Sequence, residues 1–275
     1  MSYKKHFLSI ALSAALVTSC FTTAFAAEST FTDVDPQNSE AIVYMTENKF
    51  ISGIDETKFG VDMPVSRAEA VAVLHRMSGL AEAVSEVSFS DVTEGSDYAK
   101  AVEWASANGI VSGYSDGTFA PDETITKQDL VSLLYRYAVA DDAYVTVGNS
   151  SALGKFTDAD KAADYASEAL IWAADREILT STDGKLNPEK LVTRSELAVL
   201  DYNYIKTLPV TKTVSVASTL RSEAQIPAYV TVPVDYNAEN KYPMVILCHG
   251  HGGNHNEWGG FDVITNGLAI KVLFP

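Results

Sequence analysis

Cysteine, basic side chains and long apolar runs are all scarce in this 275-residue chain, and each scarcity excludes a class of protein. The only cysteines are Cys20 and Cys248, so a small fold held together by several disulfides is excluded. The 20 basic side chains are outnumbered by 36 acidic ones, and a formal net charge of −16 makes nucleic acid an unsuitable partner. Hydrophobic residues nevertheless make up 47% of the chain, enough for packed domains.

Residues 1–26 are typical of a secretory signal peptide. Two lysines precede an apolar stretch over residues 7–21, and Ala24-Phe25-Ala26 supplies the small residues of a cleavage site. The stretch is shorter than the roughly 20 residues of a membrane-spanning helix, so we expect no stable span after cleavage. Two alternatives stay open, namely an uncleaved N-terminal anchor and lipidation of Cys20 within a lipobox-like sequence.

Three segments repeat the same order of motifs. Each opens with Phe-x-Asp, continues with apolar residues at three- and four-residue spacing, and then reaches a turn-rich loop. A Ser or Thr, with a carboxylate three residues later, then begins a second amphipathic stretch as helix cap and capping box. We predict helix–loop–helix units at residues 31–80, 89–142 and 156–208 that pack around one shared core.

The loop is most complete in the second repeat, where Gly113-Tyr114-Ser115-Asp116-Gly117 precedes Thr-Phe-Ala-Pro. Asp116 and Gly117 suit a tight turn, because glycine tolerates a positive φ. The same segment fits the Gly-x-Ser-x-Gly nucleophile elbow of esterases, but an elbow joins a strand to a helix and Pro121 prevents a helix here. We therefore interpret Gly113 to Gly117 as a repeat loop and not as a catalytic site.

Together these motifs resemble the S-layer homology family over about residues 31–208. The family signature combines Phe-x-Asp-Val, a Gly-Tyr-x-Asp-Gly-Thr-Phe-x-Pro loop and an Ile-Thr-Arg-Ala-Glu helix start. The resemblance implies a mainly α, pseudo-threefold bundle on the outside of a Gram-positive bacterium. It also implies that grooves between the repeats bind a pyruvylated secondary cell-wall polysaccharide, with other S-layer proteins as further partners and no cofactor.

A cation begins each second helix, and these three cations are the main candidates for holding an acidic sugar: Arg67, Lys127 and Arg194. Such a cation would add its charge to the helix dipole and to free amides at the helix start. Arginine can grip a carboxylate with two hydrogen bonds, whereas lysine is a point charge, so we expect the second site to be altered or weaker. The alternative is that the cations pair with neighbouring acids.

The resemblance extends the candidate set to the opening aspartates and to the loop of the second repeat. For the aspartates, helix capping is the competing structural role. The first repeat lacks the loop glycine and has Tyr44 where the others have tryptophan, so its groove is the most doubtful. Trp104 and Trp172 lie at helix-core spacing and are expected to pack in the interior. The further candidates are Asp33, Asp91, Asp158, Gly113, Asp116 and Gly117.

After Pro209 the sequence changes character. Alternating segments at 211–218 and 228–234 predict strands, and the apolar run 244–248 predicts a buried strand. We assign residues 209–219 to a linker and residues 220–275 to a partial domain. That domain resembles the start of an α/β-hydrolase of the dienelactone hydrolase or acetyl-esterase kind, because a glycine-rich loop follows the buried strand.

The loop is His249-Gly250-His251-Gly252-Gly253. By resemblance, the backbone amide of His251 would contribute to an oxyanion hole, His249 would orient the loop, and the glycines would allow close approach of the substrate oxygen. No elbow serine, acid or catalytic histidine follows the loop, so we expect this fragment to be inactive and the complete protein to be a serine-type esterase.

Two other interpretations of residues 209–275 stay open. One is a purely structural surface-layer protein with a β-rich spacer. The other is a zinc site formed by His249, His251 and His255, which lacks the aspartate of the corresponding metallohydrolase motif. We expect no metal.

Overall fold

The computed structural model describes residues 29–83, 88–141, 145, 148–181 and 183–208, and the backbone of 210–217 and 225–232. The chain divides into two compact units, Met1–Ile205 and Lys206–Pro275, which are described separately below. The expected signal peptide at 1–26 and the glycine-rich loop at 249–253 lie outside the described residues.

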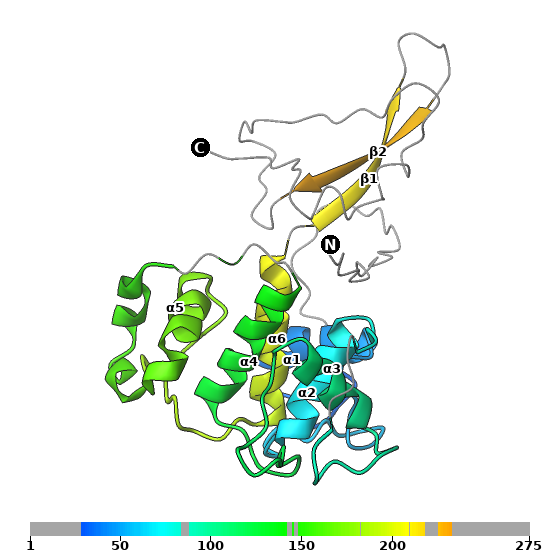
Figure 1. Cartoon of the computed structure of the whole chain (residues 1–275). Coiled ribbons are helices and arrows are strands. Elements are labelled where there is room, and N and C mark those ends of the chain that lie inside the picture. The colour runs from blue at the N-terminus through cyan, green and yellow to red at the C-terminus, as the bar shows by residue number, and fades with distance from the viewer. Residues whose placement is uncertain are drawn as a thin grey trace, which may run out of the picture. The chain divides into compact units, whose positions relative to one another are not determined.

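The first unit is built from pairs of helices, one pair in each repeat (Figure 1). The first helices are α1 (Pro36–Glu47), α3 (Ala99–Ala107) and α5 (Ser167–Asp175). The second helices are α2 (Arg67–Met77), α4 (Lys127–Ala140) and α6 (Arg194–Thr207). Short 3₁₀ helices precede α5, at Ser150–Lys155, Ala159–Lys161 and Asp164–Ala166. The predicted mainly α, helix–loop–helix organisation of this region is thus confirmed.

Each second helix begins at the predicted cap. The Ser66 hydroxyl accepts a hydrogen bond from the Glu69 amide at 3.1 Å, and Thr126 accepts one from the Asp129 amide at 3.4 Å. In the third repeat the carboxylate of Glu196 also accepts from the backbone N–H of the capping threonine at 3.1 Å, which completes the capping box. The corresponding acids of the first two repeats, Glu69 and Asp129, make other contacts, which are described below.

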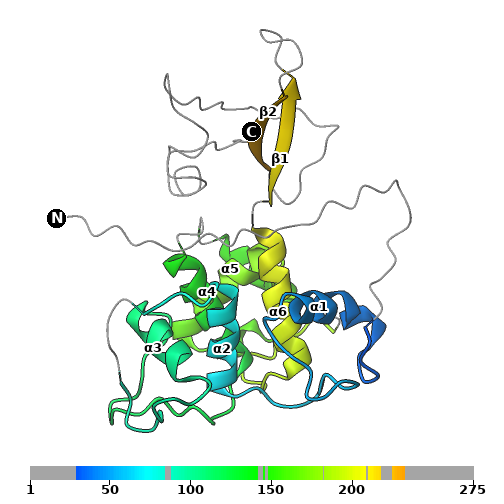
Figure 2. The ribbon, with the colours of Figure 1, turned by 90° about the vertical axis from the view of Figure 1, so that its right-hand side faces the viewer.

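The three repeats meet in a closed ring of backbone hydrogen bonds. The Val65 amide donates to the Val192 carbonyl at 2.9 Å, Val192 donates to Ile125 at 3.0 Å, and Ile125 donates to Val65 at 3.1 Å. All three side chains are buried. Each repeat therefore contacts both others at equivalent positions, which gives the unit an approximate threefold organisation. Figure 2 shows α2, α4 and α6 beside one another, with α1 and α3 on their outer sides.

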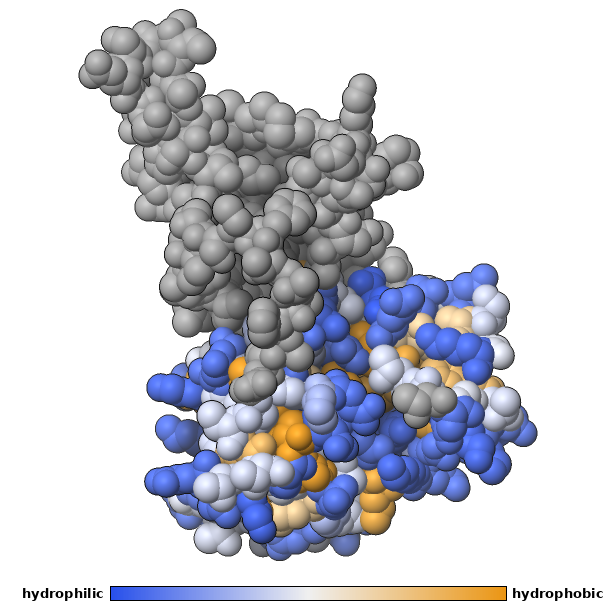
Figure 3. All heavy atoms as spheres, turned by 180° about the vertical axis from the view of Figure 1, so that it is seen from behind, coloured by the Kyte–Doolittle hydropathy of each residue, from blue (hydrophilic) through white to orange (hydrophobic). Residues whose placement is uncertain are grey.

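Aromatic side chains fill much of the core, as expected for the two tryptophans. Trp104 and Trp172 are each 1% exposed. The ring of Trp104 lies 6.1 Å from that of Tyr137, and the ring of Trp172 lies 6.0 Å from that of Tyr204. The face of this unit that is visible in Figure 3 carries mainly hydrophilic side chains, with smaller apolar areas among them.

One polar side chain interrupts this core. Asp201 of α6 is completely buried, and neither of its carboxylate oxygens has a hydrogen-bond partner among the described residues. It lies eight residues after the helix cap, where the other two repeats have Leu74 and Leu134, both fully buried. Burial raises the pKa of Asp201 to about 8.

In the second unit, the described backbone forms two antiparallel strands, β1 (Val210–Ala217) and β2 (Gln225–Val232). They match the two alternating segments predicted from the sequence to within a few residues. Strand β1 lies in the segment 209–219 that the sequence suggested as a linker. An antiparallel pair does not identify an α/β-hydrolase sheet, and the predicted strand at 244–248 lies outside the described residues. Among the helices that the structure describes, none has the length and apolar character needed to cross a membrane.

Candidate binding sites at the repeat seams

Each second helix starts against the loop of the next repeat. The backbone N–H of Arg67 donates to the Glu123 carbonyl at 2.8 Å, that of Lys127 to Lys190 at 2.9 Å, and that of Arg194 to Met63 at 2.9 Å. The next amide of each helix is bonded to the same neighbouring loop. We name these junctions seam 1–2, seam 2–3 and seam 3–1, after the repeats that supply the helix and the loop.

This arrangement corrects one sequence-based expectation. The amides at the helix starts were expected to be free for a ligand, but carbonyls of the next repeat and the capping hydroxyl satisfy them. The physical reason is that a helix start buried at a seam needs acceptors, and the neighbouring loop provides them. The cationic side chains are therefore the groups through which a helix start could hold an anion.

The three opening aspartates bind the loops of their own repeats. Asp33 accepts from the amides of Phe59, at 2.8 Å, and Gly60, at 2.7 Å. Asp158 accepts from Leu186 at 2.6 Å and Asn187 at 3.0 Å, and these N–H donors lower its pKa. Asp91 makes the same pair of contacts with Phe119 and Ala120 in the second repeat. Each carboxylate thus fixes the loop to the start of its repeat.

The candidate residues of the second loop have comparable structural contacts. Asp116 accepts from the backbone N–H of Thr118 at 3.0 Å and from its hydroxyl at 2.6 Å, which closes the turn. Gly117 has φ +83°, where other residues are strained. A Cβ on Gly113 would lie 2.3 Å from Cε1 of Phe89, so the glycine lets this ring approach the loop backbone.

At seam 3–1 the side chain of Arg194 is bound by other groups of the protein. Nε of Arg194 donates to the Phe59 carbonyl at 3.1 Å, one Nη donates to the Ser52 carbonyl, and the other contacts Glu69 Oε1. Its guanidinium lies 5.0 Å from the ring of Phe59, and the side chain is only 10% exposed. Each of the three guanidinium nitrogens thus has a partner within the protein, and the contact with Glu69 agrees with the alternative that the cations pair with neighbouring acids.

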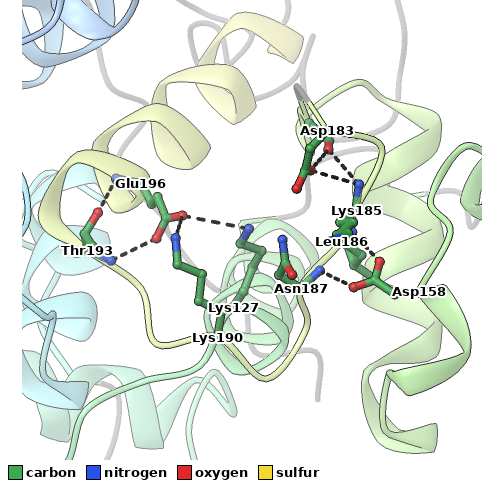
Figure 4. Close-up of polar contacts among 10 residues, drawn as sticks. Lys127, Asp158, Asp183, Lys185, Leu186, Asn187, Lys190, Thr193 and Glu196 are labelled. Carbon is green, nitrogen blue, oxygen red and sulfur yellow. Dashed lines mark hydrogen bonds and ion pairs between the residues drawn. The ribbon is translucent and has the colours of Figure 1, made fainter.

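At seam 2–3 a pocket of about 300 Å³ is lined by Lys127, Lys185, Lys190, Asp183 and Glu196, among others. Lys127 Nζ lies 3.9 Å from Glu196 Oε1, and Lys190 Nζ lies 2.8 Å from the same oxygen (Figure 4). Burial lowers the pKa of Lys127. Burial tends to raise the pKa of Glu196, but hydrogen bonds from Lys190 and from the backbone lower it on balance. The pocket therefore holds more cations than acids, with one glutamate between two lysines.

At seam 1–2 the arginine has no acidic partner among the described residues. Nε of Arg67 donates to the Phe119 carbonyl at 3.1 Å, the counterpart of the Arg194–Phe59 contact. The guanidinium lies 4.9 Å from the Phe119 ring and 5.3 Å from the ring of Tyr114, which is 48% exposed. Arg67 is half-buried, so a charged group lies beside an accessible aromatic ring.

The acid that corresponds to Glu69 and Glu196 at this seam is Asp129. Its oxygens accept from the hydroxyls of Thr126 and Tyr165, each at 2.5 Å. Reasoning from sequence identified the three cations but did not identify Glu69 and Glu196 as partners of two of them, and it also missed Tyr114. The available signal was the carboxylate three residues after each cap, which was interpreted only as part of a capping box.

Comparison with known proteins agrees with the repeats. The S-layer homology domain matches three times, at residues 30–71, 88–131 and 155–198. The chain is 28% identical over 202 residues to the surface-layer 125 kDa protein of Lysinibacillus sphaericus, and 27% identical over 182 residues to the exoglucanase XynX of Acetivibrio thermocellus. It is also 27% identical over 92 residues to a cellulosome-anchoring protein of Acetivibrio thermocellus.

These matches cover limited parts of the relatives. They include 72%, 64% and 32% of this chain, respectively, but only 16%, 16% and 21% of the relatives' own lengths. The chain therefore spans only a small part of the length of these relatives.

Proposed function

Because the chain carries three S-layer homology domains, we propose that its helical unit anchors a secreted protein non-covalently to the bacterial cell wall. The ligand in this proposal is a secondary wall polysaccharide whose pyruvyl groups present carboxylates. The surface-layer and cellulosome-anchoring relatives support a location at the cell surface.

The observation that carries the proposal is that Arg67 has no acidic partner among the described residues. A guanidinium without an acidic partner at a seam can donate two charge-assisted hydrogen bonds to a carboxylate. The exposed ring of Tyr114 beside it offers the flat apolar surface against which a sugar ring can pack. An acidic sugar satisfies both groups at once.

The seams are not equivalent in this proposal. Seam 1–2 binds through Arg67, and seam 2–3 binds through Lys127 in the lysine-lined pocket. At seam 3–1 we assign Arg194 a structural role, because each of its three guanidinium nitrogens already contacts an acceptor within the protein. We also assign Asp33, Asp91 and Asp158 a structural role, as the acceptors that hold the loops.

Co-sedimentation tests this proposal. The full chain should sediment with purified Gram-positive sacculi that retain their secondary polymer, and should do so less with sacculi whose pyruvyl ketals were removed by mild acid. Arg67→Ala should weaken sedimentation, whereas Lys100→Ala, which removes an exposed cation of α3 that takes part in none of the seam contacts described above, should not. Equal sedimentation with intact and depyruvylated sacculi would contradict recognition of the pyruvyl group.

For residues 220–275 we propose the start of an esterase-like hydrolase domain, supported by the His249–Gly253 sequence. The exoglucanase relative offers a precedent for an enzyme with a segment similar to this chain. The 275-residue chain should not hydrolyse p-nitrophenyl acetate, whereas the product of the whole gene should. A whole-gene product without esterase activity would favour the structural spacer.

A further inference from the structure

The three seams present the same acid position, but the acid differs in length. Three residues after each helix cap stand Glu69, Asp129 and Glu196. Glu69 contacts Arg194 at seam 3–1, and Glu196 lies 3.9 Å from Lys127 at seam 2–3. In both seams the carboxylate crosses from the loop-bearing repeat to the cation of the preceding repeat. Asp129 is the member of the set without such an ion pair among the described residues.

Two features keep Asp129 from the cation at its seam. Its side chain is one methylene shorter than glutamate, which reduces its reach toward Arg67. Both of its oxygens are also bonded elsewhere, one to the Thr126 hydroxyl and the other to the hydroxyl of Tyr165 from the third repeat. The second repeat has the same Asp-Tyr-Ala sequence at residues 97–99, but among the described residues the hydroxyl of Tyr98 makes no corresponding hydrogen bond to Glu69.

We infer that the acid three residues after the cap is a built-in competitor for the ligand, and that Asp129 leaves seam 1–2 as the principal binding site. This inference rests on the proposed function and specifies which seam performs it. A carboxylate on the same chain is present at high effective concentration, so an external carboxylate must displace it before reaching the cation. At seam 1–2 the described residues form no ion pair with Arg67 that a ligand would have to displace.

The contacts also predict which of the other two seams binds the ligand more tightly. At seam 2–3 the 3.9 Å separation of Lys127 and Glu196 is long for an ion pair, and an open pocket adjoins it. At seam 3–1 the guanidinium is held by one carboxylate and two carbonyls, all of which a ligand would have to replace. Affinity should therefore fall from seam 1–2 to seam 2–3 to seam 3–1.

Exchange of one methylene tests the inference without changing net charge. In the full chain, Asp129→Glu should weaken binding to polymer-bearing sacculi about three- to tenfold, the range of one charge-assisted interaction. Asp129→Gln has the same length without the charge and should bind as the wild type does. Glu196→Asp should strengthen the residual binding of the Arg67→Ala variant, because it shortens the competitor at seam 2–3.

Thermal unfolding of each variant separates effects on folding from effects on binding. Binding of Asp129→Glu at the wild-type level, in a variant that unfolds at the wild-type temperature, would overturn the inference and leave the wall-binding proposal standing. Equal losses for Asp129→Glu and Asp129→Gln would overturn it as well, because length and not charge would then be responsible. A wild-type chain that binds no sacculi would instead overturn the proposed function.

Discussion

Replacement of Asp201 by leucine should stabilise the helical unit, and the gain should grow with pH. Asp201 is completely buried, its oxygens lack hydrogen-bond partners among the described residues, and leucine occupies the equivalent position in both other repeats. A buried carboxyl group without partners is destabilising, since its ionised form loses hydration and gains nothing in exchange. Leucine restores the apolar packing that Leu74 and Leu134 provide.

The size of the effect follows from the pKa. Burial raises the pKa of Asp201 from 3.8 to about 8, so the native state binds the proton more tightly than the unfolded state does. The native state then loses stability as pH rises above about 4, and the loss continues until the pH passes about 8. At about 1.4 kcal/mol per pH unit, the unfolding free energy at pH 7 is about 4 kcal/mol below its value in acid, through this group alone.

Urea unfolding at pH 5 and at pH 7.5 measures this contribution. The difference in unfolding free energy between Asp201→Leu and the wild type should increase by about 3 kcal/mol between the two pH values. Asp122→Leu removes an exposed aspartate and controls for the change in net charge. If the Asp201→Leu difference is the same at both pH values, the buried carboxyl group does not titrate as the structure requires and the reasoning is refuted.

Two further predictions concern the seams and the loops. Arg194→Ala should lower the unfolding free energy by about 3 kcal/mol, because it leaves Glu69 and two carbonyls at a mostly buried site without their donor. Sedimentation of this variant with wall sacculi should barely change. The opposite pattern, normal stability with lost binding, would indicate that Arg194 binds the ligand. The backbone N–H groups of Leu186 and Asn187 lower the pKa of Asp158, so its contribution to stability is present above pH 4 and is lost as pH falls through its lowered pKa. Asp158→Asn should flatten this acid dependence in denaturant titrations below about pH 4, and an unchanged acid slope would contradict it.

Much of the fold could be predicted from local sequence. Apolar spacing, turn residues and helix caps act over a few positions, so the helix pairs and the starts of α2, α4 and α6 followed from the order of residues. The threefold ring of Val65, Ile125 and Val192 did not, because each of its hydrogen bonds joins different repeats. The repetition of one unit implied a shared core, but it did not specify the contacts that close it.

The candidate site was likewise predicted only in part from the sequence. The amino-acid order alone determined that a cation begins each second helix, and it identified Arg67, Lys127 and Arg194. Tertiary structure decided that Arg194 contacts Glu69, whereas Arg67 has no acidic partner among the described residues, since each cation lies against the loop of another repeat. Coulomb attraction and hydrogen bonding depend on distance in space, and residues 194 and 69 come into contact only when the three repeats close on one another.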